Sequence, residues 1–433
     1  MVSIGWPAIV LIISSLLFYG VAGPFDTIVF LSTVCVNWLI QIAGLPGRWR
    51  IAAAALVNIG LIFSFKYKGL FFGAGPATGS YIDTALPLGI SFYCFQALAY
   101  HVDVVKGHSP PARSFASFFL FKSFFPQLVA GPIVRARQFL PQVERLFAGT
   151  PRRHRLLSYG LALCVLGLIK KVGLADSLAP IVDDIFSTAP DSAYYAWLGA
   201  VLFTFQIYFD FSGYSDIAIG AAYLLGMRLP INFLTPYMST GPREFWQRWH
   251  ISLSTWIRDY LYIPLGGGRG HWARAAVVLV GSMAIAGLWH GANYTFVLWG
   301  GGWGLYILAG RLSHGWISCP RAPRWALHMT MVVMLWVLFR SPSLGYAMSY
   351  LTTMLSFQGW QAPAEAAPAW LAAAGVAALF VLHAIEYRLN RRATVLALRR
   401  WNTPFGFGLL IGLGLLLILI PSSNANPFIY FRF

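Results

Sequence analysis

Charged residues are scarce in this chain. Only 10% of its 433 residues are Asp, Glu, Lys or Arg, whereas 58% are hydrophobic. A soluble globular domain averages about 25% charged and about 45–50% apolar residues, so the composition excludes an ordinary cytosolic enzyme. Acidic residues are the scarcest, with 14 against 31 Lys and Arg. The Lys and Arg residues lie in short loops between apolar runs, which is typical of the topology of membrane proteins. We therefore expect no nucleic-acid partner.

Cysteine and metal-ligand patterns are nearly absent. The four cysteines lie far apart with no CxxC spacing, which excludes a disulfide framework and a structural zinc site. His250 and His290 are 40 residues apart and no Cys or carboxylate pattern accompanies them. A GxSxG nucleophile motif is also missing. We expect no metal site, and a chemistry that depends on histidine.

Long apolar runs dominate what is present. A bilayer-spanning helix needs about 20 predominantly apolar residues, and several runs are shorter. We therefore expect an all-α, polytopic integral membrane protein with about ten to twelve transmembrane helices plus re-entrant or interfacial helices. No repeat divides the chain, so residues 1–433 are expected to form one membrane domain. The candidate spans are Trp6–Val21, Ile28–Ala43, Ile51–Phe65, Leu86–Tyr100, Phe115–Val129, Leu156–Ile169, Ala196–Phe209, Ile217–Met227, Ala275–Trp289, Tyr294–Ala309, Trp325–Phe339, Leu371–Ile385 and Gly406–Ile420.

Basic loops indicate the orientation of the chain. Arginines cluster in three loops: the loop that follows the second apolar run (Ile28–Ala43), residues 135–155, and residues 388–400. The positive-inside rule makes these loops cytoplasmic. One span follows the last of them, so the C-terminus is expected outside the cytoplasm, while the N-terminal orientation stays open.

Two aspartates interrupt the apolar pattern at residues 208–216. Asp210 and Asp216 lie with serines around Gly213, which permits a break in the helix. Ionisable groups at membrane depth usually face a cavity or a partner. The aspartates therefore either line a pocket or cap and pack helices inside the bundle.

A second polar segment covers residues 241–274. Phe245, Trp249, Leu253, Trp256 and Tyr260 recur at spacings of three or four and predict one face of a helix. Its mixture of Trp, Arg and apolar residues suits an interfacial or re-entrant helix. A following glycine-rich stretch, Gly266–Gly270, could approach a phosphate but lacks the lysine and serine of a P-loop. The arginines around it either bind a phosphorylated cofactor or anchor a cytoplasmic loop: Arg258, Arg269 and Arg274.

A third segment contains His290. Residues 275–310 carry no charged side chain other than this histidine if it is protonated. As one helix they would measure about 54 Å, well beyond a hydrocarbon core of about 30 Å. The chain must turn, and Gly287, Gly291 and Asn293 mark the turn. His290 at this break is either a general base or a buried core histidine.

Five segments together resemble the membrane-bound O-acyltransferase family, in its bacterial alginate and exopolysaccharide O-acetylase branch. They lie between residues 86 and 304 and include YFDFSGYSDIAIG (208–220), EFWQRWHISLSTWIRDYLYIPLGG (244–267) and GLWHGANYTFVLWG (287–300). The other two are LPLGISFYCFQALAYHVDVVKG (86–107) and FFPQLVAGPIVR (124–135). The resemblance implies helices around a central funnel in the bacterial inner membrane.

The resemblance also implies roles. The donor would be acetyl-CoA or another acyl donor from the cytoplasm, used as a substrate and not held permanently. His290 matches the family's general base. His250 matches its second histidine, which either orients the acyl group or acceptor or is a structural residue with hydrogen-bonded packing beside Trp246 and Trp249. The aromatic tail, residues 426–433, is similar to tails in this branch, and Tyr430 either relays the acyl group to a separate extracytoplasmic acetyltransferase or anchors the last helix.

Three alternatives to acetyl transfer onto a polysaccharide stay open. D-alanyl transfer to teichoic acid occurs in the same family. A transporter could use Asp210, Asp216 and the two histidines as an ion path, although no paired half-structures are visible. The third is a scaffold for a polysaccharide secretion complex.

Overall fold

A computed structural model describes most of the chain. It covers residues 6–72, 86–129, 131–149, 157–268, 271–313, 320–356, 359–360, 369–389 and 403–419. Every regular element among these residues is helical. Six of the described helices are long and apolar enough to cross a membrane: Pro24–Ile42, Gly47–Phe72, Leu157–Ile185, Trp272–His290, Arg321–Arg340 and Leu371–Arg388. Two shorter apolar helices are Trp6–Gly20 and Pro404–Leu417. The prediction of an all-α, multi-pass membrane protein is confirmed.

The chain divides into two compact units. Unit 1 comprises Met1–Gly160 and Ala218–Pro230, and unit 2 comprises Leu161–Ile217 and Ile231–Phe433. Two long helices, α9 (Leu157–Leu168) and α11 (Ala193–Leu224), carry residues of both.

Unit 1 is built from helices joined by buried polar contacts. Asn37 and Asn58 exchange amide hydrogen bonds of 3.2 and 2.9 Å between α2 and α3, and His101 of α5 lies 3.2 Å from Asn37 Oδ1. Such contacts hold apolar helices in register where the hydrophobic effect between helices is weak. The elements are α1 (Trp6–Gly20), α2 (Pro24–Ile42), α3 (Gly47–Ile62), the π-helix η1 (Phe63–Tyr67), α4 (Lys68–Phe72), α5 (Ile90–Val105), α6 (Phe115–Ser123), α7 (Phe125–Leu128) and α8 (Ala136–Phe147).

Unit 2 contains the segments that the sequence marks as functional. Its elements after α9 are the π-helix η4 (Ile169–Ala175), α10 (Asp176–Ile185), the 3₁₀ turn η5 (Pro236–Met238), α12 (Pro242–Arg248), α13 (Ile251–Ile257), the π-helix η6 (Arg258–Tyr262), α14 (Trp272–His290), α15 (Tyr294–Leu312), α16 (Arg321–Arg340), α17 (Leu344–Ser356), α18 (Ala369–Arg388) and α20 (Pro404–Leu419).

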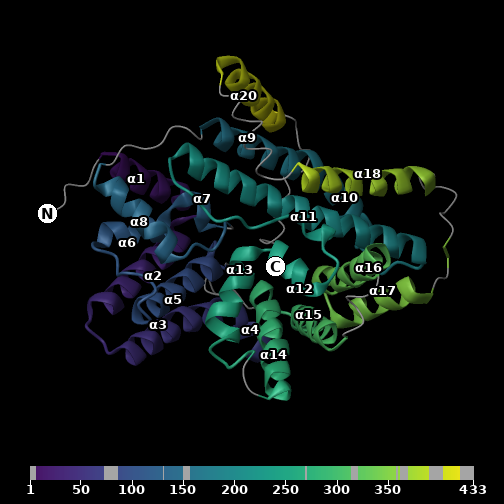
Figure 1. The fold of residues 1–433 in the computed structure, drawn as a ribbon, viewed down its shortest axis with the longest axis horizontal. Helices are drawn as coiled ribbons and strands as arrows, with labels where there is room; N and C mark the ends of the chain where they lie inside the picture. Colours follow the sequence, from purple (N-terminus) through teal and green to yellow (C-terminus); the bar gives the residue numbers. More distant parts are fainter. Residues whose placement is uncertain are drawn as a thin grey trace. The chain divides into compact units, whose positions relative to one another are not determined.

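Helices α14 and α15 pack side by side with almost no space between their backbones (Figure 1). A Cβ added at Gly287 would lie 2.0 Å from the Phe296 carbonyl oxygen, and one at Gly300 would lie 2.1 Å from the Met283 carbonyl oxygen. The turn between them ends where Asn293 caps α15 by accepting a hydrogen bond of 3.0 Å from the Thr295 N–H. The expected turn within residues 275–310 is therefore confirmed.

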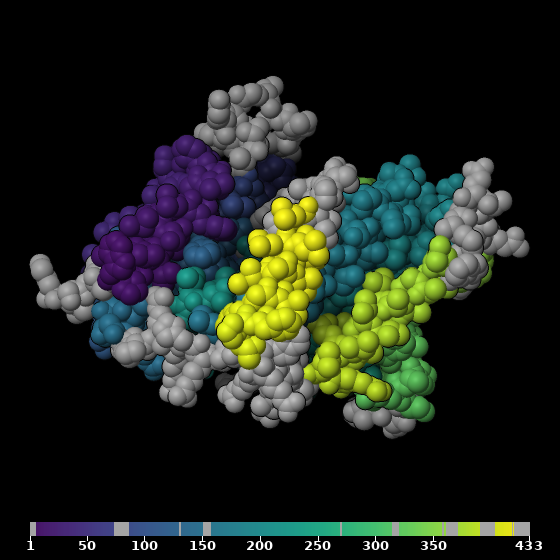
Figure 2. Space-filling view, turned by 90° about the horizontal axis from the view of Figure 1, so that it is seen from above, coloured from purple at the N-terminus to yellow at the C-terminus, as the bar shows by residue number. Residues whose placement is uncertain are grey.

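The apolar side chains of helix α20 are distributed as in a lipid-facing helix, with some packed against the protein and others exposed. Leu410 and Leu417 pack against Ala162 and Val165 of α9. Figure 2 shows α20 in yellow at the surface, where large apolar side chains such as Leu416 are exposed. Apolar side chains on an outer face are stable in a bilayer because the lipid interior is itself apolar.

Two local expectations were wrong. Residues 241–260 do not form one helix, because α12 and α13 are separated at Trp249–His250, where His250 has φ 40°. The helix α11 runs unbroken through Gly213. This glycine instead permits close packing, since a Cβ at Gly213 would lie 2.8 Å from the Gly167 carbonyl oxygen of α9.

Candidate active site

His290 is the last residue of α14 and is enclosed by aromatic rings. Its side chain is buried, and its ring centroid lies 5.1 Å from that of Trp299 and 5.3 Å from that of Phe339. The neighbouring Trp289 ring is 4.8 Å away. The tight packing of α14 on α15 fixes the distance between His290 and Trp299, because both lie beside the contacting glycines. A base in this position works in a water-poor environment where electrostatic effects are strong.

His250 lies at the break between α12 and α13. Its left-handed backbone conformation is unusual for a residue other than glycine, and such strain concentrates at functional sites. The side chain is fully buried. Its Nδ1 lies 3.1 Å from Asn232 Oδ1, and burial lowers the pKa of His250 to about 3. His250 is therefore neutral near pH 7 and is suited to hydrogen bonding more than to carrying a proton.

The structure brings the two predicted histidines together. Their ring centroids are 6.4 Å apart although 40 residues separate them in the sequence. A direct N–H···N hydrogen bond of about 3 Å between two imidazoles would hold their centroids no more than about 5.4 Å apart. The two imidazoles therefore do not form a direct hydrogen bond with each other.

Buried hydrogen-bond groups lie next to this pair or one ring contact away from it. The indole N–H groups of Trp249, Trp299 and Trp336 are buried and have no hydrogen-bond partner among the described residues, and the same holds for His250 Nε2. The three tryptophans are linked, with Trp336 centroids 4.9 Å from Trp249 and 5.6 Å from Trp299. Buried polar atoms without a partner call for an explanation, and functional sites are one place where they occur. We consider these donors able to hold a carbonyl oxygen.

Sequence reasoning did not single out Trp299, Trp336 or Phe339. Trp299 belongs to the GLWHGANYTFVLWG segment, and its position nine residues after His290 carries no contact information by itself. Trp336 and Phe339 lie in α16, an apolar helix in which nothing in the pattern distinguishes them from lipid-facing residues.

The aspartates of α11 are engaged in ion pairs. Lys170 Nζ lies 2.8 Å from Asp216 and 2.6 Å from Glu386 of α18. Lys171 lies 2.8 Å from Asp210 and 2.7 Å from Asp176. Both lysines belong to η4, whose π-helical geometry is frequent at functional sites. Of the two interpretations of the aspartates, the structure supports packing inside the bundle.

The arginines near the glycine-rich stretch have local partners. Arg258 forms an exposed ion pair of 2.8 Å with its neighbour Asp259. Arg274 donates a hydrogen bond of 3.4 Å to the Leu265 carbonyl oxygen at the end of the turn. Sequence reasoning missed Arg311, which donates to the Tyr262 hydroxyl at 3.1 Å. Arg269 and Tyr430 lie outside the described residues.

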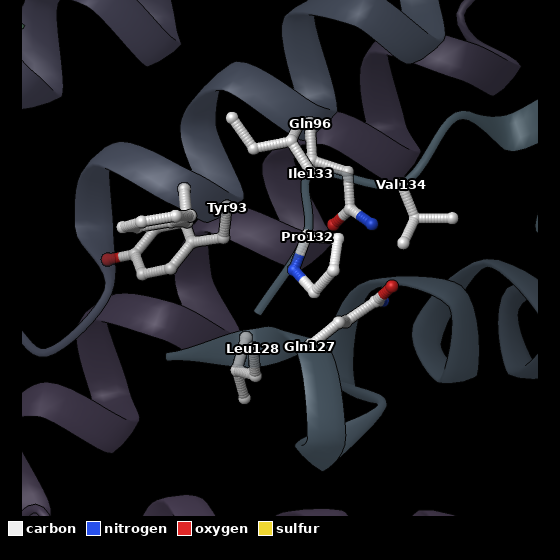
Figure 3. Close-up of a pocket in the computed structure, with 8 residues that line it drawn as sticks. Tyr93, Gln96, Gln127, Leu128, Pro132, Ile133 and Val134 are labelled. Carbon is white, nitrogen blue, oxygen red and sulfur yellow. The ribbon is translucent and has the colours of Figure 1, made fainter. Parts of the chain in front are cut away.

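A small pocket in unit 1 lies against the FFPQLVAGPIVR segment. Figure 3 shows Gln96 and Gln127 on opposite sides of Pro132, with Val134 beside them. Both amides donate to the Phe121 carbonyl oxygen, at 3.4 and 2.6 Å. The polar groups lining it are amides and the Tyr93 phenol, none of which is a base near neutral pH. The lining of this pocket therefore supplies no general base.

No group of three or more His, Cys, Asp or Glu residues that could hold a metal ion occurs within the described part of the chain. The donor set around the histidine pair is made of indole, imidazole, amide and hydroxyl groups. This set suits hydrogen bonding to a substrate.

Comparison with known proteins decides the family. The model of the membrane-bound O-acyltransferase family matches residues 106–353, which include both histidines. The chain belongs to this family. A probable alginate O-acetylase AlgI of Azotobacter vinelandii is 40% identical over 72% of this chain and 64% of that protein. The corresponding protein of Pseudomonas putida is 36% identical over 89% and 84%.

A relative named for a different activity also matches. The peptidoglycan O-acetyltransferase of Helicobacter pylori is 32% identical over 82% of this chain and 75% of that protein. The family resemblance expected from the sequence motifs is confirmed by these matches.

The chain spans under two thirds of the length of the Azotobacter relative.

Proposed function

We propose that this protein is an O-acetyltransferase of the bacterial inner membrane. It passes an acetyl group from a cytoplasmic donor, acetyl-CoA, across the membrane for O-acetylation of an exopolysaccharide such as alginate or cellulose. The observation that carries the proposal is the buried His290–His250 pair within the segment that matches the family model. Its relatives are named as O-acetylating proteins that act on alginate and on peptidoglycan, which supports acetyl as the transferred group.

His290 acts as the general base in this proposal. An acceptor hydroxyl donates its proton to His290 while its oxygen attacks the thioester carbonyl carbon. The new carbon–oxygen bond forms, the carbon–sulfur bond breaks, and the thiolate of CoA receives the proton from the imidazolium. The buried indole N–H group of Trp299, whose ring contacts His290, stabilises the negative charge that develops on the carbonyl oxygen.

The aromatic enclosure favours a small acyl group. Trp299, Phe339 and Trp289 surround the His290 ring at 4.8–5.3 Å. These side chains are buried and interdigitated, and close-packed interiors do not readily make room for extra methylene groups. An acetyl group fits such surroundings better than a long acyl chain.

His250 orients a substrate. Because its pKa is lowered by burial, it stays neutral and accepts a hydrogen bond from an O–H or N–H group of the bound acceptor or donor. It is too far from His290 for a direct hydrogen bond, so the substrate lies between them.

Donor binding is assigned to Arg258, Arg269 and Arg274. Changing each to Glu should raise the acetyl-CoA concentration needed for half-maximal rate and increase salt sensitivity if it contacts CoA phosphates. Arg258 and Arg274 already have local partners, so anchoring of a cytoplasmic loop is the competing role. Unchanged donor dependence in all three variants would establish the anchor.

Tyr430 is proposed as a relay for the acetyl group on the extracytoplasmic side, where the C-terminus is expected. Its hydroxyl would form an acetyl ester and pass the group to a separate extracytoplasmic acetyltransferase. Tyr430→Phe removes only the hydroxyl. The relay predicts an acetyl-tyrosine adduct in the wild-type chain by mass spectrometry, and loss of both the adduct and polymer acetylation in the variant. Normal acetylation in the variant would leave only an anchoring role.

The function is tested with the purified full-length chain and with a deletion strain. Acetyl-CoA should raise the Tm of the chain, because a ligand that binds only the native state stabilises it. The polymer of the deletion strain should lose acetyl esters with its sugar backbone unchanged. Loss of D-alanyl esters would favour D-alanyl transfer, an unaltered Tm would favour a transporter, and full acetylation by His290→Ala at normal expression would favour a scaffold.

A further inference from the structure

Asn232 forms hydrogen bonds with the first residues that follow the His250 break. Its backbone carbonyl accepts a hydrogen bond of 3.0 Å from the Ile251 N–H. Its side-chain Oδ1 accepts from the Ser252 N–H at 3.2 Å and from the Ser252 hydroxyl at 2.9 Å. Its Nδ2 donates to Ser215 Oγ at 3.3 Å. These contacts satisfy N–H groups that have no acceptor within the helix where α13 begins, and Asn232 itself is fully buried.

The network determines which atom of the Asn232 amide faces His250. A backbone N–H is always a donor, so the atom that it contacts must be the amide oxygen. The same oxygen lies 3.1 Å from His250 Nδ1. Two atoms with lone pairs at that distance would repel, so His250 Nδ1 carries the proton and donates it to Asn232.

The tautomer of His250 follows from this assignment. A neutral imidazole has one N–H and one lone pair, so protonation at Nδ1 leaves Nε2 as an acceptor. His250 Nε2 is buried and has no hydrogen-bond partner among the described residues. His290 is a titratable side chain in ring contact with His250, at 6.4 Å between centroids, and Phe211 also contacts the His250 ring, at 4.7 Å.

We propose that Asn232 is a positioning residue for acyl transfer, which holds His250 in the Nδ1-protonated form so that Nε2 accepts a hydrogen bond from an O–H or N–H group of the substrate. The role rests on the proposed function, in which His250 orients the acceptor or donor. Asn232 acts through His250 and takes no proton itself. The second ring nitrogen of a functional histidine is commonly set in this way by its neighbour.

The first experiment measures the tautomer without requiring activity. Nitrogen NMR of the full-length chain labelled with ¹⁵N-histidine distinguishes protonated from unprotonated ring nitrogens, and the His250→Gln variant identifies the His250 signals by difference. At pH 7 we expect a protonated Nδ1 and an unprotonated Nε2. An Nε2-protonated ring would overturn the proposal. Because this result does not depend on the donor, it is separate from failure of the proposed acetyl transfer.

The second experiment asks whether Asn232 acts through His250. Asn232→Ala should lower kcat about tenfold to a hundredfold, as loss of a group that orients a histidine typically does. The double variant with His250→Ala should be no slower than His250→Ala alone, because coupled residues are not additive. Losses that multiply would overturn the proposal and indicate a structural role. Where Asn232→Ala does not fold, Asn232→Ser takes its place in the same cycle.

Two further variants separate the two ends of the amide. Ser215→Ala removes the partner of Nδ2 but leaves Oδ1 on His250, so its kcat should stay within about twofold of wild type. Asn232→Asp places a carboxylate beside the Nδ1–H and favours the imidazolium. As the pH is lowered, the rate of Asn232→Asp should begin to fall at a higher pH than the rate of the wild type does. The reason is that a protonated Nε2 no longer accepts a hydrogen bond from the substrate. If the rate of Asn232→Asp fell at the same pH as the rate of the wild type, the proposal would be contradicted.

Discussion

Adding one methyl group at Gly300 should slow transfer strongly although neither histidine is changed. A Cβ at this position would lie 2.1 Å from the Met283 carbonyl oxygen and 3.0 Å from the Gly287 Cα, whereas ordinary contact begins at 3.4 Å. All of these neighbours are backbone atoms, so no side chain can rotate away. In Gly300→Ala the helices α14 and α15 must part by more than about 1 Å at this level.

Such a displacement reaches the site directly. Helix α14 ends in His290, and Trp299 precedes Gly300 in α15. A misplacement of about 1 Å in a catalytic constellation can lower the rate about 100-fold, and overpacking typically costs about 1–3 kcal/mol of stability. We therefore expect kcat of acetyl transfer to fall about 100-fold with a moderate decrease in Tm.

The neighbouring glycine provides the matched control. A Cβ at Gly301 would meet nothing within 4 Å, so Gly301→Ala should keep the wild-type kcat. Its Tm should be equal or slightly higher, since alanine favours a helix over glycine. Both variants are assayed as purified full-length chains with acetyl-CoA, the separate extracytoplasmic acetyltransferase and a soluble acceptor polysaccharide. Equal kcat values for the two would refute the idea that helix contact sets the geometry around His290.

Three other expectations concern buried titratable groups. His290→Gln should lower kcat by about 10²–10⁴-fold, the usual effect of removing a general base, while the Tm increase with acetyl-CoA persists; activity above a tenth of wild type would argue against the role. His250 has a folded pKa of about 3 against 6.5 when unfolded, so below pH 6.5 the unfolded chain binds the extra proton and stability falls until about pH 3. Between pH 7.5 and 5 this loss amounts to about 2 kcal/mol, and His250→Gln should show a correspondingly smaller decrease in Tm; an equal decrease would contradict it. Lys170→Met leaves Asp216 and Glu386 without their shared cation and should cost about 3–5 kcal/mol in unfolding experiments, whereas an unchanged Tm would show that the ion pairs contribute little.

The sequence by itself determined the class of the molecule. Long apolar runs and scarce charge exclude a soluble fold because their burial requires a bilayer. The length of the apolar stretch around His290 required a turn, and the turn lies at residues 291–293 as expected. These results follow from local composition and helix geometry, which need no knowledge of distant contacts. The motifs likewise identified the family, and with it the two histidines.

Tertiary structure decided the site. His250 and His290 are 40 residues apart in the chain, and only the packing of α12, α13, α14 and α16 places their rings 6.4 Å apart among buried aromatic side chains. The helix expected over residues 241–260 breaks because Asn232, from a segment outside it, captures the N–H groups of Ile251 and Ser252. Periodicity records which residues could share a helix face, but it contains nothing about a competing hydrogen-bond acceptor. For the same reason Asn232 was invisible in the sequence, since its role depends on which atoms it meets in space.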